Sequence, residues 1–188
     1  MSQQKLFNYL KESGSILEGH FLLSSGLHSP NYVQCALALK NPIKAAEFGK
    51  ELFKLWKWEK PNIIVSPALG GIIIGYEVAR FFKVPFIFTE RENNIMTLRR
   101  GFEIKKGEKA IIVEDVFTTG KSTLEVAQIL KSKKAKILGA MSIINRMGKN
   151  KLPFKNISLL KLDLKTYTKE NCPLCLSKIP LIKPGSRA

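Results

Sequence analysis

The chain has 188 residues and carries 31 Lys and Arg against 15 Asp and Glu, which gives a formal net charge of +16 at pH 7. This length favours a single domain over residues 1–188, and 45% hydrophobic with 24% charged residues excludes collagen-like and disordered classes. No apolar run reaches the roughly 18 residues that cross a bilayer and no secretory signal is evident, so the sequence predicts a cytoplasmic protein without a membrane partner.

The net charge and the cysteine content restrict the possible classes of binding partner only in part. The positive charge predicts attraction to nucleic acid, acidic lipid or small phosphorylated molecules, without choosing among them. Three cysteines without an export signal disfavour a disulfide framework, and Cys35 in its apolar stretch is interpreted as a core residue. Cys172 and Cys175 form one CxxC pair, which is half of a zinc site. We assign no metal to this pair and interpret it as incidental thiols or a knuckle in the tail.

The predicted elements begin with a short helix over residues 2–13, which Gly14 ends, and a second helix from Asn41 to about Trp58. Short apolar runs then alternate with helical patterns. Strands are expected at residues 62–66, 85–89, 109–114 and 136–144, and helices at residues 71–82 and 121–132. This alternation predicts an α/β fold with a central, mostly parallel sheet flanked by helices, and ligands bind such sheets beyond the carboxyl ends of the strands.

Three segments show no clear hydrophobic periodicity of a helix or a strand. Residues 19–31 are rich in Gly, Ser and His, and residues 167–188 hold three Pro and one Gly, which predicts an irregular tail over the surface. Residues 90–107 are mostly polar and long for a loop between two strands, so we expect them to be functional or disordered.

The most informative segment is residues 111–123, where an apolar run ends in Glu114 and Asp115 and Thr-Thr-Gly-Lys-Ser follows. Two acids at a buried strand end are costly unless something satisfies them, and a ribose diol or a sugar-bound Mg²⁺ would do so. The turn over residues 118–122 opens a helix, where backbone N–H groups and the dipole favour a phosphate. Together the two halves predict a ribose phosphate site. The plainer interpretation is a solvated strand end followed by a helix cap.

Gly120, Lys121 and Ser122 can also be read as the end of a Walker A loop. That loop needs a glycine five positions before its Gly-Lys pair, and the sequence has Asp115 there. Because a carboxylate at that position would repel phosphates, nucleotide hydrolysis is disfavoured.

The strand, the two acids and the Thr-rich turn resemble the phosphoribosyl-pyrophosphate motif of the type I phosphoribosyltransferases. Residues 19–32 (GHFLLSSGLHSPNY) are similar to the base-binding segment of the orotate phosphoribosyltransferases, and Asn145-Arg146 lies where that family places an orotate-binding arginine. The resemblance implies the family's fold, with residues 1–40 as a base-binding hood. It also implies transfer of the phosphoribosyl group from phosphoribosyl pyrophosphate to orotate, giving orotidine 5′-monophosphate and pyrophosphate for UMP biosynthesis. Mg²⁺ would be the cofactor, held mainly by the substrate.

The resemblance assigns a role to each matching residue. Glu114 and Asp115 would hold the ribose hydroxyls and the turn would bind the 5-phosphate. The implied donor-binding residues are Glu114, Asp115, Val116, Phe117, Thr118, Thr119, Gly120, Lys121 and Ser122. The implied pyrophosphate loop is Ala68, Leu69, Gly70 and Gly71, without the Lys that some members carry. The implied orotate contacts are Thr118, Arg146 and Ser24, the last at a position where many members have Lys.

The polar stretch over residues 90–102 stands where the family has a mobile catalytic loop that closes over the neighbouring subunit's site, which implies a homodimer. The stretch offers Arg91, Arg99 and Arg100, and no Lys or His. Guanidinium groups stay protonated, so we expect them to neutralise the leaving diphosphate and not to donate protons.

Two alternatives remain open. A purine or other base phosphoribosyltransferase would share the same ribose phosphate site. A non-catalytic regulator that binds phosphoribosyl pyrophosphate could use the +16 charge to bind nucleic acid. The basic residues are not interleaved with clustered aromatic side chains for base stacking, so we expect no nucleic-acid partner.

Overall fold

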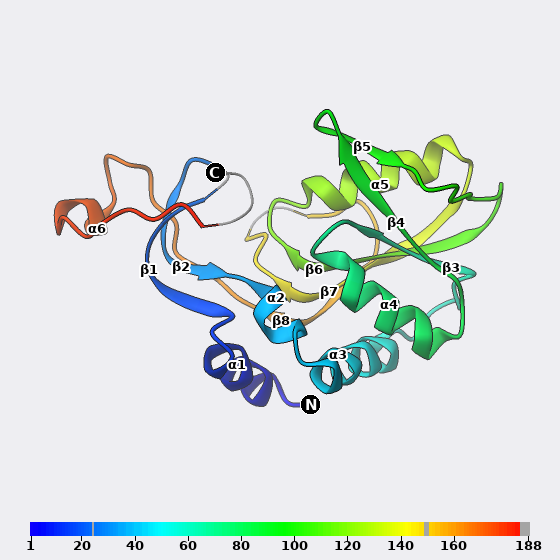
Figure 1. The fold of residues 1–188 in the computed structure, drawn as a ribbon, viewed down its shortest axis with the longest axis horizontal. Helices are drawn as coiled ribbons and strands as arrows, with labels where there is room; N and C mark the ends of the chain where they lie inside the picture. The colour runs from blue at the N-terminus through cyan, green and yellow to red at the C-terminus, as the bar shows by residue number, and fades with distance from the viewer. Residues whose placement is uncertain (24, 149–150, 185–188) are drawn as a thin grey trace.

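A six-stranded sheet with helices on both faces makes up the larger part of the computed structural model, which describes residues 1–23, 25–148 and 151–184 (Figure 1). The strand order is β5-β4-β3-β6-β7-β8, and only the pairing of β4 with β5 is antiparallel among these described strands. The bounds are β3 (Ile63–Pro67), β4 (Phe86–Glu92), β5 (Ile95–Leu98), β6 (Lys109–Phe117), β7 (Lys136–Asn145) and β8 (Asn156–Lys161). The predicted α/β fold with a mostly parallel sheet is confirmed.

The central strands are apolar without a break because helices cover both of their faces. Ile111 and Val113 of β6 pack in one core cluster with α1 (Gln3–Glu12), α3 (Pro42–Leu55) and α4 (Gly71–Phe82). Ala110 and Ile112 point the other way, into a second cluster with α5 (Lys121–Ser132). All four side chains are fully buried. A strand buried on both faces has no reason to alternate with polar residues.

The first two predicted helices form close to their expected bounds. The Ser2 hydroxyl accepts a hydrogen bond from the backbone N–H of Lys5 at the start of α1. The Asn41 side chain accepts from Ile43 and Lys44 at the start of α3, as its position before a proline predicts. α3 ends at Leu55, before the expected Trp58, and a short helix α2 (Cys35–Leu39) precedes it.

Residues 90–107 were expected to be irregular, and this was wrong for their first half. β4 continues to Glu92, Asn93 and Asn94 turn the chain with positive φ, and β5 returns antiparallel along β4. Asparagine tolerates the left-handed conformation that a two-residue hairpin turn requires, so this pair closes the hairpin. The charged residues Glu90, Arg91 and Glu92 hid the extension of β4 beyond Thr89. They lie past the end of β3, where no core requires apolar side chains. β8 was also not predicted.

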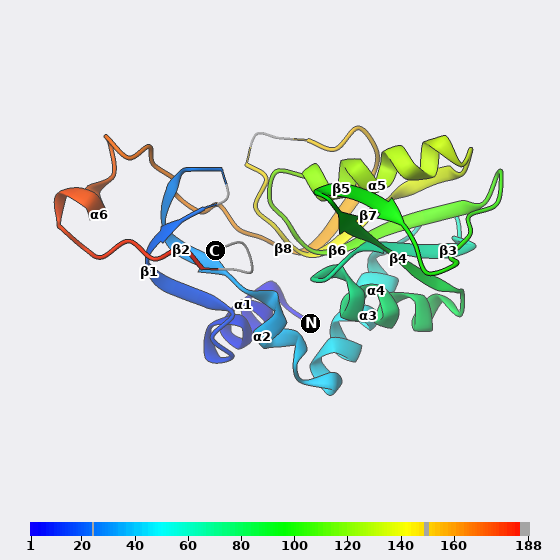
Figure 2. The same ribbon diagram turned by 45° about the horizontal axis from the view of Figure 1, so that its top comes forward.

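A smaller lobe stands beside one end of the main sheet (Figures 1 and 2). Its two strands, β1 (Ile16–Leu22) and β2 (His28–Val33), form an antiparallel hairpin where an irregular segment was expected. The described part of the tail lies along this hairpin through single bridges between Phe21 and Ile182 and between His28 and Tyr167, and it contains the short helix α6 (Pro173–Leu176). The first and last parts of the chain therefore build one lobe.

Among the described residues, none of the helices combines the length and the apolar character that crossing a bilayer would take.

Candidate functional site

The carboxyl ends of β3, β6 and β7 meet at one edge of the sheet and bring together three predicted segments. β3 leads into residues 68–71, β6 into the turn over residues 118–122, and β7 into Arg146. The peptide bond between Ala68 and Leu69 is cis, and the N–H of Ala68 donates to the carbonyl of Thr89 at 2.7 Å. A methyl group on Gly70 would lie 2.7 Å from Asp115 Oδ1. The glycine therefore lets the first loop lie directly against the acid pair.

The Thr-rich turn joins the end of β6 to the N-terminus of α5. Gly120 has φ +79°, a left-handed conformation that favours glycine, and it occupies the N-cap of α5. Thr118 and Thr119 are exposed, and Thr119 Oγ1 accepts from the N–H of Lys121 at 3.3 Å. The first N–H groups of a helix have no partner within it, so this end of α5 can bind an anion.

Val116 and Phe117 belong to the predicted donor-binding stretch, but their side chains face the interior. Phe117 is fully buried in the core cluster under α5, and Val116 packs in the other cluster. Only the backbones of these two residues can reach a ligand at this edge. The carbonyl of Phe117 already accepts from the N–H of Arg146 at 2.9 Å, which ties the ends of β6 and β7 together.

Burial favours the neutral form of both acids. Burial raises the pKa of Glu114 to about 8, against the opposing effect of the Thr123 hydroxyl, which donates to Glu114 Oε2. Burial also raises the pKa of Asp115, whose Oδ1 accepts from the N–H of Val116 at 2.9 Å. Both side chains keep part of their surface open to solvent. A ligand that brings hydroxyl donors or a cation would therefore favour ionisation of the pair.

We expect Glu114→Gln to make the free protein more stable at alkaline pH. The folded-state pKa lies above the ordinary value of 4.5, so the stability that neutral Glu114 provides is present below about pH 4.5 and lost as pH rises through about 8. Gln stays neutral throughout. The unfolding midpoint of the variant minus that of the unmodified chain should grow between about pH 5 and pH 9. Glu12→Gln, at the exposed end of α1, is the control. A constant difference would contradict the assigned cause.

Arg146 and Tyr32 bring the smaller lobe into the site. Burial lowers the pKa of the Arg146 guanidinium, and the nearby Tyr32 partly offsets this effect. Burial raises the pKa of the Tyr32 phenol, on which both Arg146 and Asp115 also act. Tyr32 lies on β2, so the hairpin presents an aromatic side chain to the end of the main sheet. Ser24, the other predicted residue of this segment, lies outside the described residues.

Each of the three predicted arginines is paired with a glutamate. Arg91 reaches from β4 to Glu125 of α5 with both terminal nitrogens, one of them 3.3 Å from Oε1. Arg99 pairs with Glu92 at 3.2 Å, and Arg100 with Glu90 at 2.9 Å.

The arginines differ in how firmly they are held. Arg91 is 21% exposed, whereas Arg99 is 48% and Arg100 60% exposed. The charges of Arg91 and Glu125 act on the pKa of Glu114, which places this ion pair near the acids. Arg91 is thus an anchored part of the site's surroundings, while the other two can exchange their partners in solvent.

Sequence reasoning assigned no role to Thr123 or Glu125, and it placed Tyr32 only as the last residue of the base-binding segment. Thr123 directly follows the predicted turn, on the first turn of α5 that points back at Glu114. Helical spacing could have indicated it, because a residue in the first turn faces the strand that precedes the helix. Glu125 pairs with Arg91 of another element, and no local pattern marks it.

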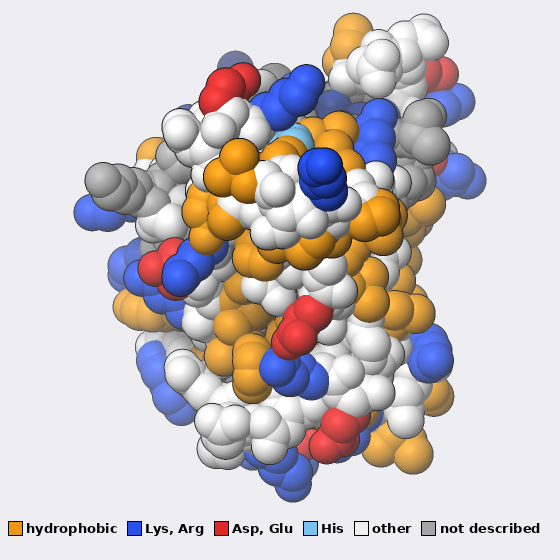
Figure 3. Space-filling view, turned by 90° about the vertical axis from the view of Figure 1, so that its left-hand side faces the viewer, with side chains coloured by type: hydrophobic (Ala, Val, Ile, Leu, Met, Phe, Trp, Pro, Cys, Tyr) orange, Lys and Arg blue, Asp and Glu red, His pale blue; other side chains and the backbone are white. Residues whose placement is uncertain are grey.

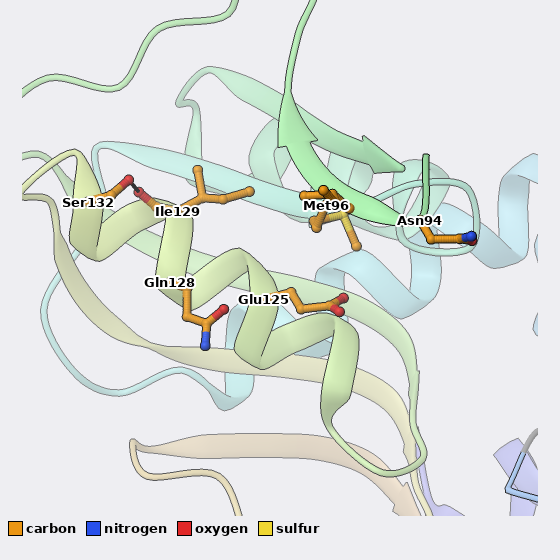
Figure 4. A pocket seen from close by; sticks show the side chains of 7 residues that line it. Asn94, Met96, Glu125, Gln128, Ile129 and Ser132 are labelled. Carbon is orange, nitrogen blue, oxygen red and sulfur yellow. Dashed lines mark hydrogen bonds between the residues drawn. The ribbon is translucent and has the colours of Figure 1, made fainter. Parts of the chain in front are cut away.

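A surface cavity of about 410 Å³ lies between β5 and α5 (Figure 4). It is lined by Asn94, Ile95, Met96, Glu125, Gln128, Ile129 and Ser132. Another, of about 520 Å³, lies beside α1. Neither lining includes the residues at the strand ends, so the candidate site is identified by its chemistry and not by the depth of a cavity.

Comparison with known proteins agrees with the fold. Residues 38–169 match the model of the phosphoribosyl transferase domain. Two curated relatives are named orotate phosphoribosyltransferase. The protein of Caldanaerobacter subterraneus subsp. tengcongensis is 46% identical over 188 residues, which cover 100% of this chain and 99% of the relative. That of Thermotoga maritima is 50% identical over 181 residues, which cover 95% and 96%.

The solved orotate phosphoribosyltransferase of Aeropyrum pernix superposes with a TM-score of 0.71 at 22% identity, covering 84% of this chain and 93% of that one. At this identity the similarity supports the fold alone.

Proposed function

The chain belongs to the phosphoribosyl transferase family, and we propose that it transfers the 5-phosphoribosyl group of phosphoribosyl pyrophosphate to orotate in pyrimidine biosynthesis. The products are orotidine 5′-monophosphate and pyrophosphate. One observation carries the proposal: an acid pair, a Thr-rich turn at a helix N-terminus and a partly buried arginine converge at one sheet edge in a chain whose full-length relatives are named for this activity.

The reaction breaks the bond between the anomeric carbon and pyrophosphate, so positive charge develops on the sugar and negative charge on the leaving group. Glu114 and Asp115 accept hydrogen bonds from the ribose hydroxyls and lie where they can stabilise the developing positive charge. The turn over residues 118–122 holds the 5-phosphate, and the backbone of residues 68–71 can approach the diphosphate closely because Gly70 and Gly71 have no side chain. The protein's task is to position the reactants.

The residues at this edge fit Mg²⁺ as a cofactor. Mg²⁺ prefers oxygen ligands and is usually held by one or two carboxylates together with substrate phosphates. Glu114 and Asp115 supply carboxylates whose raised pKa falls as a cation approaches. When bound to the diphosphate, Mg²⁺ stabilises the leaving group as a Lewis acid. Residues 68–71 include no Lys, so the loop itself provides only backbone donors.

Orotate is recognised by Arg146 and covered by Tyr32. The planar guanidinium of Arg146 can bind the orotate carboxylate through two parallel hydrogen bonds, which are strong because both groups are charged and the arginine is largely desolvated. The smaller lobe, which takes β1 and β2 from residues 1–40, then forms a hood over the base. The orotate ring can react as an anion, so this mechanism needs no Ser or Cys nucleophile. A purine base lacks the carboxylate that Arg146 would pair with.

We expect Arg99→Ala and Arg100→Ala to lower kcat by about tenfold while leaving the KM for phosphoribosyl pyrophosphate within about twofold. Both arginines are exposed and can leave Glu92 and Glu90 for the diphosphate as it departs. Lys5→Ala, which removes an exposed cation on α1, is the control. An unchanged kcat in both variants would remove these two residues from the mechanism.

We also propose a homodimer in which the β4–β5 hairpin reaches the neighbouring subunit's site. Ile73 and Tyr76 lie one turn apart on the outer side of α4, are 46% and 58% exposed, and together offer an apolar surface to a second subunit. Light scattering should give twice the 21.2 kDa mass of one chain. Ile73→Lys with Tyr76→Lys should give the single mass, and Leu124→Lys on α5 should not. A monomeric unmodified chain would contradict the proposal.

The direct test of the function is the loss of orotate absorbance when the chain, phosphoribosyl pyrophosphate and Mg²⁺ are mixed. Uracil, adenine and hypoxanthine are assayed in parallel through released pyrophosphate. We expect turnover with orotate and little with the others. Turnover with a purine instead of orotate would replace the proposed substrate. The three cysteines form no disulfide, which suits a reducing compartment, and we propose the cytoplasm as the location.

A further inference from the structure

Four metal-ligand side chains from opposite ends of the sequence meet inside the smaller lobe. They are His20 of β1, His28 of β2, Cys172 and Cys175, and one ligand atom of each lies within 4.8 Å of all the others. His20 and His28 are 2% and 3% exposed, Cys172 is fully buried and Cys175 is partly buried. Figure 3 views this end of the molecule, where hydrophobic side chains and backbone leave only a small area of histidine at the surface. We propose that this cluster binds one structural Zn²⁺.

The donor separations match a tetrahedral site. Zinc bonds of about 2.0–2.1 Å to nitrogen and 2.3 Å to sulfur place tetrahedral ligand atoms about 3.3–3.8 Å apart. Cys172 Sγ lies 3.5 Å and Cys175 Sγ 3.7 Å from His20 Nε2, and Cys175 Sγ lies 3.2 Å from His28 Nδ1. The two ring nitrogens are 2.8 Å apart, so they need to separate by about half an ångström to admit the ion.

The orientation of His20 favours a ligand over a simple hydrogen-bonding role. Its Nδ1 lies 2.8 Å from the carbonyl oxygen of Ile179, which can only accept, so Nδ1 carries the proton. In neutral His20 the lone pair is then on Nε2, the atom that faces both thiols and His28. Metal-bound histidines commonly have this arrangement, in which a carbonyl fixes the ring and its tautomer.

The small size of the β1–β2 lobe also favours a stabilising metal centre. An isolated two-stranded hairpin is marginally stable in water, and β1 with β2 forms a sheet of only two strands. None of the four clustered side chains belongs to either apolar core cluster of the protein. Burying two imidazoles and two thiols is costly without a partner. Two thiolates would neutralise Zn²⁺, and the ion would join the hairpin to the tail.

The tail is already aligned for this purpose. The N–H of Ile182 donates to the carbonyl of His20 at 2.8 Å, and His28 and Tyr167 exchange two backbone hydrogen bonds at 2.8 and 2.9 Å. Both histidines are therefore held by the segments that flank the CxxC pair. The tail alone gave no reason to assign a metal to Cys172 and Cys175, since a CxxC pair supplies only two ligands.

The test measures metal in the full chain, without a polyhistidine tag and purified with reductant. We expect about one zinc per chain by mass spectrometry in the unmodified protein and in Cys35→Ala, which removes the buried cysteine of the main core. The Cys172→Ser, Cys175→Ser double variant should retain less than about a tenth of this amount. Its unfolding midpoint should fall by about 5 °C or more, and the unmodified chain should show a similar fall after chelation.

Cobalt substitution in the unmodified chain keeps the proposal testable if the double variant does not fold. Co²⁺ bound to two thiolates and two imidazoles should give the intense visible bands of tetrahedral cobalt and a thiolate charge-transfer band, and Zn²⁺ should abolish both. A reduced, metal-free chain that develops neither band would overturn the proposal. So would zinc retained in full by the double variant, or a disulfide between Cys172 and Cys175 in the protein as purified with reductant.

Discussion

Asp115→Asn is expected to weaken the binding of phosphoribosyl pyrophosphate by about 10- to 100-fold, because the loss of one charged hydrogen-bond acceptor costs about 1.5–3 kcal/mol. Asp115 lies at the centre of the site, against Gly70 of the loop before α4 and one residue from Glu114. The amide has the same shape but cannot supply the charge that a ribose diol and a cation favour. Isothermal titration with Mg²⁺ present measures the change.

A matched variant separates this effect from a loss of folding. Glu12→Gln removes a carboxylate from the exposed end of α1 and should bind the donor like the unmodified chain. Asp115→Asn should also unfold at a midpoint no lower than that of the unmodified chain, because burial of Asp115 already disfavours its charged form. Wild-type affinity in Asp115→Asn would rule out the ribose role of the acid pair.

Arg146→Lys is expected to raise the KM for orotate by about 10- to 100-fold and to leave donor affinity unchanged, since a lysine cannot form the paired hydrogen bonds of a guanidinium. Arg146 is the predicted orotate contact that the structure places beside both Tyr32 and the end of β6. Steady-state kinetics with each substrate varied in turn distinguish the two effects.

The substrate itself provides a second control for this variant. Uracil lacks the carboxylate of orotate, so the preference for orotate over uracil should shrink in Arg146→Lys by the same factor. Arg80→Lys on the exposed face of α4 should keep the preference. If Arg146→Lys retains full discrimination, another residue recognises the carboxylate.

The sheet, and the position of the acids and the Thr-rich turn at its edge, could be predicted from sequence because their signals are local. Strands buried on both faces have short apolar runs in the sequence, as β6 does. The acids lie near the end of β6, and the turn follows directly. The turn chemistry of Gly120 and the cap at Asn41 also act within a few residues. Each of these features is fixed by contacts between near neighbours in the chain.

The features that escaped prediction depend on residues far apart in the sequence or on surfaces that no core constrains. β4 ends in the charged residues Glu90, Arg91 and Glu92 and β5 has only four residues, so the hairpin beyond Thr89 carries no long apolar pattern. Tyr32 acts on Arg146, which lies 114 positions later in the sequence. His20 and Cys172 are separated by 152 positions and meet only because the tail returns to the first hairpin.

The crystal structure of the chain with phosphoribosyl pyrophosphate and Mg²⁺ tests the central claim most directly. We expect the two ribose hydroxyls on the carboxylates of Glu114 and Asp115, and the 5-phosphate on the backbone N–H groups of residues 118–122 at the start of α5. The diphosphate should lie against residues 68–71. A donor bound with its ribose away from both carboxylates, or with its 5-phosphate elsewhere than the N-terminus of α5, would contradict this account.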